Sequence, residues 1–154
     1  MIDIIFPWKQ KYPPPIVTLI FIFLIAFSNR IVEPFSFEYQ MHLGVLIIVC
    51  GLSVLISAAR VFKQLETTIN PMQPTQASKL AIIGPFKYTR NPMYLGMSIM
   101  LVGFGLIFGA KLTVCLVVLF ILYITFFQII PEEKAMQEKF TDWKDYCSKV
   151  RRWL

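Results

Sequence analysis

The chain has 154 residues, of which 56% are hydrophobic and only 16% are charged. Ordinary soluble domains carry about 25% charged residues, so this composition excludes a disordered chain and argues against a soluble globular domain. The length suits a single domain over residues 1–154. The net charge is +6, and the three cysteines form no CxxC pair, so neither a zinc site nor a disulfide framework is indicated.

Four apolar runs follow one another, at Ile16–Phe27, Leu43–Ala59, Met93–Ala110 and Leu112–Ile130. A membrane-spanning helix needs about 20 mostly apolar residues, with a range of roughly 17–25. The last three runs meet this length, and the first is interpreted as a signal-anchor helix because no small-x-small cleavage site follows it. The runs are too long for strands and do not alternate. We therefore predict an all-α, polytopic membrane bundle of about four transmembrane helices.

A fifth helix is predicted after the last run, where Pro131 stands at a position that suits the first turn of a helix. Apolar residues then recur at helical spacing, and the residues between them are charged. This pattern predicts a C-terminal amphipathic helix lying in the membrane interface. Its apolar face comprises Met136, Phe140, Trp143, Cys147 and Val150.

The basic residues are distributed unevenly between the two sides of this predicted bundle. With four spans, 13 of the 15 Lys and Arg residues lie on one side, and only Arg30 and Lys111 lie on the other. The positive-inside rule then predicts a multi-pass protein with both termini in the cytoplasm, in the inner membrane if the source is prokaryotic. Contact with anionic lipid explains the basic charge, so nucleic acid is not expected as a partner.

The candidate chemistry lies in a polar and aromatic segment at residues 80–96, just before and within the third run. Nucleotide-binding loops and hydrolase motifs are absent from the sequence, and His42 is its only histidine, which argues against a serine triad or a metal site. Because a tight turn joins spans three and four, we expect residues 91–94 to face Glu132 and Glu133. Carboxylates at this depth need a partner, which a cationic ligand or Arg90 would supply.

These residues resemble the isoprenylcysteine carboxyl methyltransferase family, which overlaps the phospholipid N-methyltransferases. The resemblance spans residues 67–154 and rests on Gly84-x-Phe86, Arg90-Asn91-Pro92-x-Tyr94-x-Gly96, Glu132-Glu133, Phe140, Trp143 and Tyr146. It implies a small membrane helical bundle that binds S-adenosylmethionine. Residues 1–60 would form the N-terminal helices and residues 61–154 the cofactor-binding half.

The resemblance also implies roles for individual residues. It places the cofactor against Leu80, Ala81, Gly84, Phe86, Asn91, Pro92, Met93, Tyr94 and Glu132. Asn91 stands where the family often has His, and Phe86 where it often has Tyr. Gln128 is the implied substrate-binding position, where members that act on prenylcysteine have an Arg suited to a substrate carboxylate.

The chemistry of these side chains agrees with that cofactor. Glu132 can pair with the ammonium group, and Arg90 or backbone N–H groups can hold the carboxylate. The ring of Tyr94, Phe86 or Tyr88 can face the sulfonium. A carboxylate acceptor needs no base, whereas for an amine acceptor Glu133 is the expected general base. Arg90 and Glu133 are thus the predicted catalytic residues, and the acceptor is predicted to be a lipid or lipophilic molecule that enters from the bilayer.

Other interpretations of the same residues remain open. Glu132 and Glu133 can simply complement a helix N-terminus, and Asn91 can cap the third span. Trp143, Tyr146 and Trp153 suit interface anchors, and Arg151 and Arg152 suit contacts with lipid headgroups. Alternative functions are an NADPH-dependent, sterol-reductase-like membrane enzyme and a non-catalytic membrane scaffold.

Overall fold

In the computed structural model, which describes residues 12–66 and 79–154, all regular secondary structure of the described residues is helical. The all-α prediction is therefore confirmed. Lys9 and Lys11, two of the 13 basic residues assigned to the cytoplasmic side, lie outside the described residues. The elements in chain order are α1 (Pro14–Ser28), α2 (Gln40–Gln64), the 3₁₀ turn η3 (Gly84–Lys87), α3 (Pro92–Phe108), α4 (Thr113–Ile124), the π-helical turn η4 (Thr125–Ile129), α5 (Ile130–Lys139) and α6 (Trp143–Lys149).

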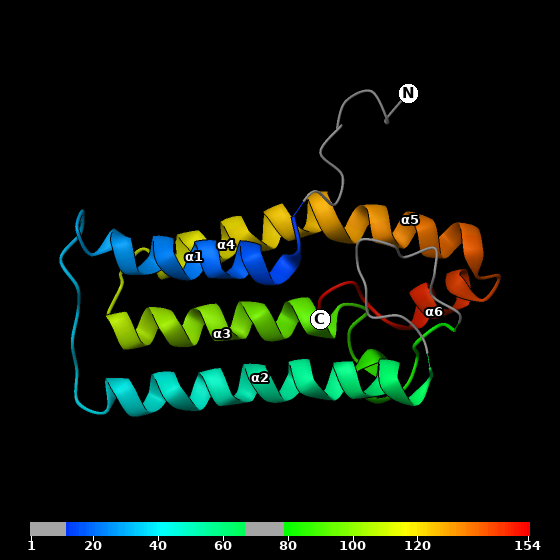
Figure 1. Ribbon diagram of the computed structural model, residues 1–154, viewed down its shortest axis with the longest axis horizontal. Helices are drawn as coiled ribbons and strands as arrows, with labels where there is room; N and C mark the ends of the chain where they lie inside the picture. Colours follow the sequence, from blue (N-terminus) through cyan, green and yellow to red (C-terminus); the bar gives the residue numbers. More distant parts are fainter. Residues whose placement is uncertain (1–11, 67–78) are drawn as a thin grey trace, which may run out of the picture.

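The long helices run side by side, with α3 in the middle (Figure 1). One side of α3 packs against α2, and the other side packs against α1 and α4, which also contact each other. The core lies between α1, α3 and α4, where Ile25, Leu101, Phe120 and Ile124 are completely buried. The rings of Phe21 and Phe120 meet edge to face at 5.3 Å between centroids.

Glycines allow α2 and α3 to approach each other closely. Gly44 and Gly51 on α2 face Gly103 and Gly96 on α3, and a Cβ atom built on Gly51 would lie 2.6 Å from the carbonyl oxygen of Gly96. The two residues in each helix are seven positions apart, which places them on one face. Gly96 and Gly103 therefore leave room for the backbone of α2.

The bundle end that carries the α3–α4 turn is fastened by hydrogen bonds from the α1–α2 connection. The Asn29 amide donates to the Phe108 carbonyl oxygen at 2.7 Å, and the Phe35 N–H donates to the Gly109 carbonyl oxygen at 2.9 Å. Gly109 adopts a φ of 65°, and a Cβ atom there would collide with the Phe35 carbonyl. Arg30 and Lys111 both lie at this end, opposite the end that carries α5 and α6 (Figure 1).

The helix that contains the fourth apolar run does not end at Pro131. Instead α4, η4 and α5 form one continuous helix from Thr113 to Lys139. The Ile130 N–H donates to the Thr125 carbonyl oxygen, which is the wider spacing of a π turn. A proline within an α-helix clashes with the carbonyl four residues earlier, and the wider turn accommodates the ring. The predicted restart of the helix at Pro131 is wrong.

The tail also differs from the single amphipathic helix that the sequence predicts. The backbone is extended at Phe140, with φ −112° and ψ 119°, so the tail turns back and forms the separate helix α6. Trp143, Tyr146 and Val150 are buried together, with Leu80 packed against them. The predicted interface-anchor role of Trp143 and Tyr146 is therefore wrong, since both side chains pack inside the protein.

Within residues 12–66 and 79–154, two helices are long and apolar enough to cross a membrane, namely Gln40–Gln64 and Thr113–Lys139. The apolar helices α1 and α3 are shorter, at 15 and 17 residues. Large apolar side chains lie exposed on the outer faces of the bundle, including Phe23 on α1, Leu46 on α2 and Val114 on α4. Exposed apolar area of this extent is typical of a surface that contacts lipid.

Candidate functional site

The candidate site forms where the chain enters α3. Gly84 turns the chain with a φ of 59° and begins η3, and Pro92 occupies the first turn of α3, where the missing proline N–H costs nothing. The Asn91 N–H donates to Thr89 Oγ1 at 3.1 Å. Asn91 occupies the N-cap position of α3, as that alternative expects, but its side chain makes no capping hydrogen bond. Its amide instead donates to the carbonyl oxygen of Arg152 at 2.9 Å.

Tyr94 on α3 and Glu132 on α5 are joined by a hydrogen bond. The Tyr94 hydroxyl donates to Glu132 Oε1 at 2.6 Å, and the tyrosine side chain is only 6% exposed. The predicted proximity of residues 91–94 to the acidic pair is thus confirmed. Since the helix is continuous through residues 125–139, the acidic pair does not stand at a free helix N-terminus, and that alternative interpretation is wrong.

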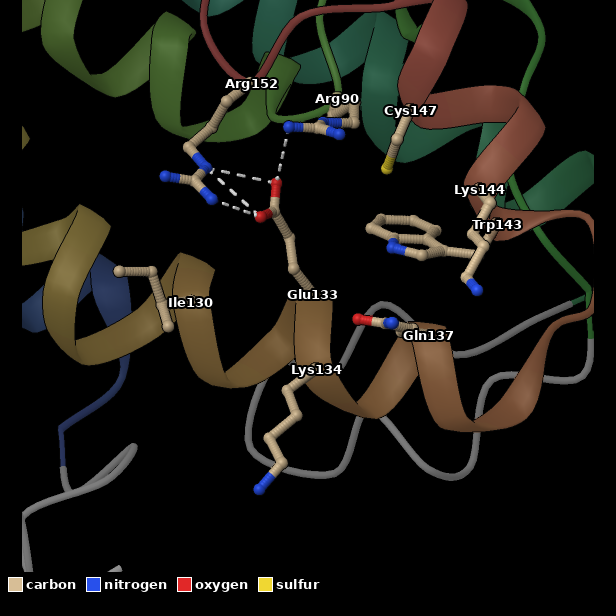
Figure 2. Close-up of a pocket in the computed structure, with 9 residues that line it drawn as sticks. All are labelled: Arg90, Ile130, Glu133, Lys134, Gln137, Trp143, Lys144, Cys147 and Arg152. Atoms are coloured by element: carbon tan, nitrogen blue, oxygen red, sulfur yellow. Dashed lines mark hydrogen bonds and ion pairs between the residues drawn. The ribbon is translucent and has the colours of Figure 1, made fainter. Parts of the chain in front are cut away.

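Glu133 lies between two arginines (Figure 2). Arg90 Nη2 is 3.2 Å from Glu133 Oε1, and Arg152 Nη2 donates to Oε2 at 2.6 Å. Arg152 Nε also donates to Oε2, at 3.1 Å. This hydrogen bonding raises the pKa of Arg152 above its ordinary value. The pairing of an acidic residue with Arg90 was one of the predicted possibilities, whereas the role of Arg152 was not predicted.

Arg90 contacts Glu133, Trp143 and the backbone of Arg151, but one nitrogen of its guanidinium group has no hydrogen-bond partner among the described residues. Its guanidinium carbon lies 5.9 Å from the centroid of the Trp143 ring, a distance at which a cation is attracted by the aromatic face. Its backbone N–H donates to the Arg151 carbonyl oxygen at 3.0 Å. The buried Nε atom has no hydrogen-bond partner among the described residues. A buried donor without a partner is costly, so an acceptor group that reached this atom would be stabilised.

Residues 151–153 fasten the tail across the start of α3. The Arg152 carbonyl oxygen accepts hydrogen bonds from Thr89 Oγ1 at 3.2 Å and from the Asn91 amide. Trp153 Nε1 donates to Thr125 Oγ1 in the π turn at 3.2 Å. The interpretation of Arg152 as a purely lipid-facing charge is wrong. No spacing pattern predicts this contact, because Arg152 follows the extended residue Val150.

Tyr146 links α6 to η3. Its hydroxyl donates to the Phe86 carbonyl oxygen at 2.7 Å. Burial raises the pKa of Tyr146 above its ordinary value of 10.0, while the nearby Arg90 partly opposes this effect. The phenol is therefore a stable donor at neutral pH.

The remaining predicted cofactor residues pack around the end of α2. Ala81 and Phe86 are buried against Ala58 and Val61, with Met93 beside them, and the Phe86 ring meets Phe62 edge to face at 5.3 Å. Gly84 lies close to Val61, because an added Cβ atom would come within 3.0 Å of its side chain. These residues therefore border the entrance to α3 from the α2 side.

An open cleft of about 450 Å³ lies between α5 and α6, next to the arginine–glutamate cluster (Figure 2). Its lining includes Glu133 and Trp143 but neither Tyr94 nor Glu132. The two neighbouring acidic residues therefore face different parts of the site. Glu132 contacts α3, and Glu133 lines the cleft. Among the described residues, no three His, Cys, Asp or Glu side chains form a group that could hold a metal ion.

Comparison with known proteins identifies the family. The family model described as phospholipid methyltransferase matches residues 39–142. The chain belongs to this family. A Haemophilus influenzae protein described as uncharacterized is 43% identical over 63 residues, which are 40% of this chain and 100% of that protein. No solved structure matches the chain.

The part of the chain that matches the phospholipid methyltransferase family contains Arg90, Tyr94 and the acidic pair at positions 132 and 133. The match ends before Tyr146 and Arg152. Gln128, the predicted substrate-binding residue, also lies within the match. It is 1% exposed, and its amide donates to the Tyr12 carbonyl oxygen at 2.9 Å. Its Oε1 atom is buried without a partner among the described residues.

Proposed function

We propose that this member of the phospholipid methyltransferase family is an integral membrane methyltransferase that uses S-adenosylmethionine and acts on a lipid or lipophilic acceptor. Family membership supports methyl transfer in general. The observation that carries the cofactor assignment is the cluster at the start of α3, where Tyr94 contacts Glu132 and Arg90 contacts Glu133. This cluster combines both charge signs with buried aromatic side chains.

The residues present fit the charges of S-adenosylmethionine. The cofactor supplies an electrophilic methyl group on a sulfonium, and it also carries an ammonium and a carboxylate group. We propose that Glu132, oriented by Tyr94, pairs with the ammonium group. The unpartnered Nε atom of Arg90 supports a role in holding the carboxylate. Residues 80–86 and 91–93 are proposed to surround the rest of the cofactor.

Glu133 has two possible roles that depend on the acceptor. For an amine acceptor we propose that it receives the proton that the amine must lose. For a carboxylate acceptor no base is required, and Glu133 would position Arg90 through the 3.2 Å ion pair. Gln128, with its unpartnered Oε1 atom, is proposed to contact the acceptor from inside the bundle.

The membrane arrangement is part of the same proposal. We propose four spans formed by α1, α2, α3 and the helix from Thr113 to Lys139, with both termini in the cytoplasm. The described basic residues support this, since Arg30 and Lys111 lie at one end of the bundle and the start of α3 with the tail lies at the other (Figure 1). The site would then lie at the level of the cytoplasmic headgroups.

Calorimetry of the purified protein in mild detergent tests the cofactor. We expect saturable binding of S-adenosylmethionine and S-adenosylhomocysteine, and weaker binding by a Glu132→Gln variant, which loses the charge but keeps the shape. Glu138→Gln is the matched control because Glu138 is exposed on the same helix. Binding of NADPH alone would favour the reductase alternative, and a folded protein that binds none of these would favour the scaffold.

The acceptor atom is tested by transfer of a labelled methyl group. The protein is incubated with methyl-labelled S-adenosylmethionine and bacterial membranes, and the label is followed into the lipid extract. Release of the label as methanol by mild base indicates a carboxyl methyl ester. Retention of the label under the same treatment indicates methylation of nitrogen. Label that stays in the aqueous phase would contradict a lipophilic acceptor.

A further inference from the structure

The cleft between α5 and α6 carries more positive charge than its one acidic residue can balance. Its lining includes the cationic side chains of Arg90, Arg152, Lys134 and Lys144, and the single carboxylate of Glu133. Glu133 is already shared by the two arginines. Lys134 and Lys144 are exposed, and neither forms an ion pair with a described residue. A cleft lined in this way attracts anions.

The acidic residues of the same region do not cancel this charge within the cleft. Glu138, Asp142 and Asp145 are exposed, and none of them lines the cleft. In Figure 2 the Lys134 and Lys144 side chains extend away from the Glu133 carboxylate, and both residues line the cleft. The uncompensated charge therefore lies where a ligand arriving from outside would meet it first.

An apolar stripe leads along the helix to this cleft. Ile130 lines the cleft and is 40% exposed, and the exposed residues that precede it on the helix include Phe126 at 59%, Leu122 at 46% and Leu119 at 54%. Their spacings of four, four and three residues place them on one face of the helix. The same face thus changes from apolar to cationic within one turn, between Ile130 and Lys134.

We propose that the α5–α6 cleft binds the phosphate group of an anionic membrane lipid, whose acyl chains lie along the exposed face of α4. Lys134 and Lys144 attract the phosphate, and the Gln137 amide in the same cleft can donate a hydrogen bond to it. A zwitterionic headgroup would bring an ammonium group toward four cations, so the cleft favours lipids with net negative charge. This inference rests on charge and exposure, and it does not depend on methyl transfer.

Native mass spectrometry with competing lipids tests the site. The full chain in neutral detergent is incubated with equal amounts of phosphatidylglycerol and phosphatidylcholine that have the same acyl chains, and the bound lipids are counted. We expect phosphatidylglycerol to be preferred by about tenfold or more, because each lysine near an anionic headgroup contributes appreciably. A Lys134→Gln/Lys144→Gln double variant should bind the two lipids about equally.

The matched control is a Lys87→Gln/Lys149→Gln double variant. It makes the same change in net charge at exposed positions that do not line the cleft, and it should keep the preference. The proposal is overturned if the cleft variant keeps the preference, or if the control loses it to the same degree. It is also overturned if millimolar inorganic phosphate displaces phosphatidylglycerol from the unaltered protein, because the ligand would then be a soluble anion.

Discussion

At the scale of single residues, Glu133 has the largest effect on the charge balance of the site. Its carboxylate pairs with Arg90 and Arg152, whose side chains are 12% and 38% exposed. Glu133→Gln removes the anion and leaves two guanidinium groups close together, of which that of Arg90 is largely shielded from water. We expect the free energy of unfolding to fall by about 2 kcal/mol, measured by thermal unfolding in detergent with circular dichroism.

Glu138→Gln serves as the control for this measurement because Glu138 is exposed on the same helix. It should change stability by no more than about 0.5 kcal/mol. Arg152→Gln should cost less than Glu133→Gln, since it leaves Glu133 paired with Arg90. Equal losses in all three variants would contradict the central position of Glu133.

The raised pKa of Tyr146 predicts that the protein loses stability at alkaline pH. Burial raises its pKa above 10.0 in the folded protein, so between the unfolded and folded pKa values the unfolded chain has lost a proton that the folded chain still holds. Stability contributed by the neutral phenol is therefore complete below about pH 10 and falls as the pH rises above it. Unfolding at pH 8 and pH 11 should show a smaller loss for Tyr146→Phe than for the unaltered protein. An identical loss would contradict this assignment.

The sequence predicted part of the site at the residue scale. The spacing of Tyr94 from the α3–α4 turn and of Glu132 from the same turn placed the two residues near each other, and their hydrogen bond confirms it. Arg152 could not be placed, because it follows an extended segment that has no periodicity. Its position depends on hydrogen bonds from Thr89 and Asn91, which lie about 60 residues earlier.

At the scale of elements, the glycines between α2 and α3 predict a strong response to added side-chain volume. A Cβ atom on Gly96 would lie 2.7 Å from the Gly51 carbonyl oxygen, and backbone cannot move aside as a side chain can. We expect Gly96→Ala to lower the free energy of unfolding by about 1–3 kcal/mol, measured by thermal unfolding in detergent. Cys50→Ala, at an exposed position of α2, is the control and should leave the transition almost unchanged.

The elements differ in how well the sequence predicted them. The run Leu43–Ala59 lies within α2, and the run Met93–Ala110 nearly coincides with α3, because continuous apolar residues leave helix as the only stable backbone in lipid. Pro131 was misleading, since a π turn accommodates it inside one long helix. The break at Phe140 was also not predicted. Helical spacing continues across it, and only tertiary packing of Trp143 and Tyr146 determines the turn.

At the scale of the whole molecule, the proposed orientation in the membrane predicts a pattern of chemical accessibility. In a background without cysteines, Lys111→Cys lies in the α3–α4 turn and Lys149→Cys lies in the tail, and both positions are exposed. A membrane-impermeant maleimide added to intact cells should label position 111, and it should label position 149 only after permeabilisation. Labelling of both positions in intact cells would contradict the four-span topology.

The overall organisation could be predicted because it depends on composition and charge rather than on individual contacts. Arg30 and Lys111 do lie at the same end of the bundle, where Asn29 and Phe35 hydrogen-bond to the end of α3. The order of packing could not be predicted. Nothing in the apolar runs shows that α3 is the main partner of α2, since that arrangement follows from glycines seven residues apart meeting across two helices.

The attachment of residues 151–153 to the start of α3 has a consequence for biosynthesis. The side chains of Thr89 and Asn91 donate hydrogen bonds to the carbonyl oxygen of Arg152. The ribosome adds Arg152 only after it has made every helix of the bundle. Contacts between such distant positions form late. Each newly made molecule therefore passes through an interval in which its helices are already in place while Glu133 still lacks one of its two cations, and ligand affinity should appear only when that interval ends.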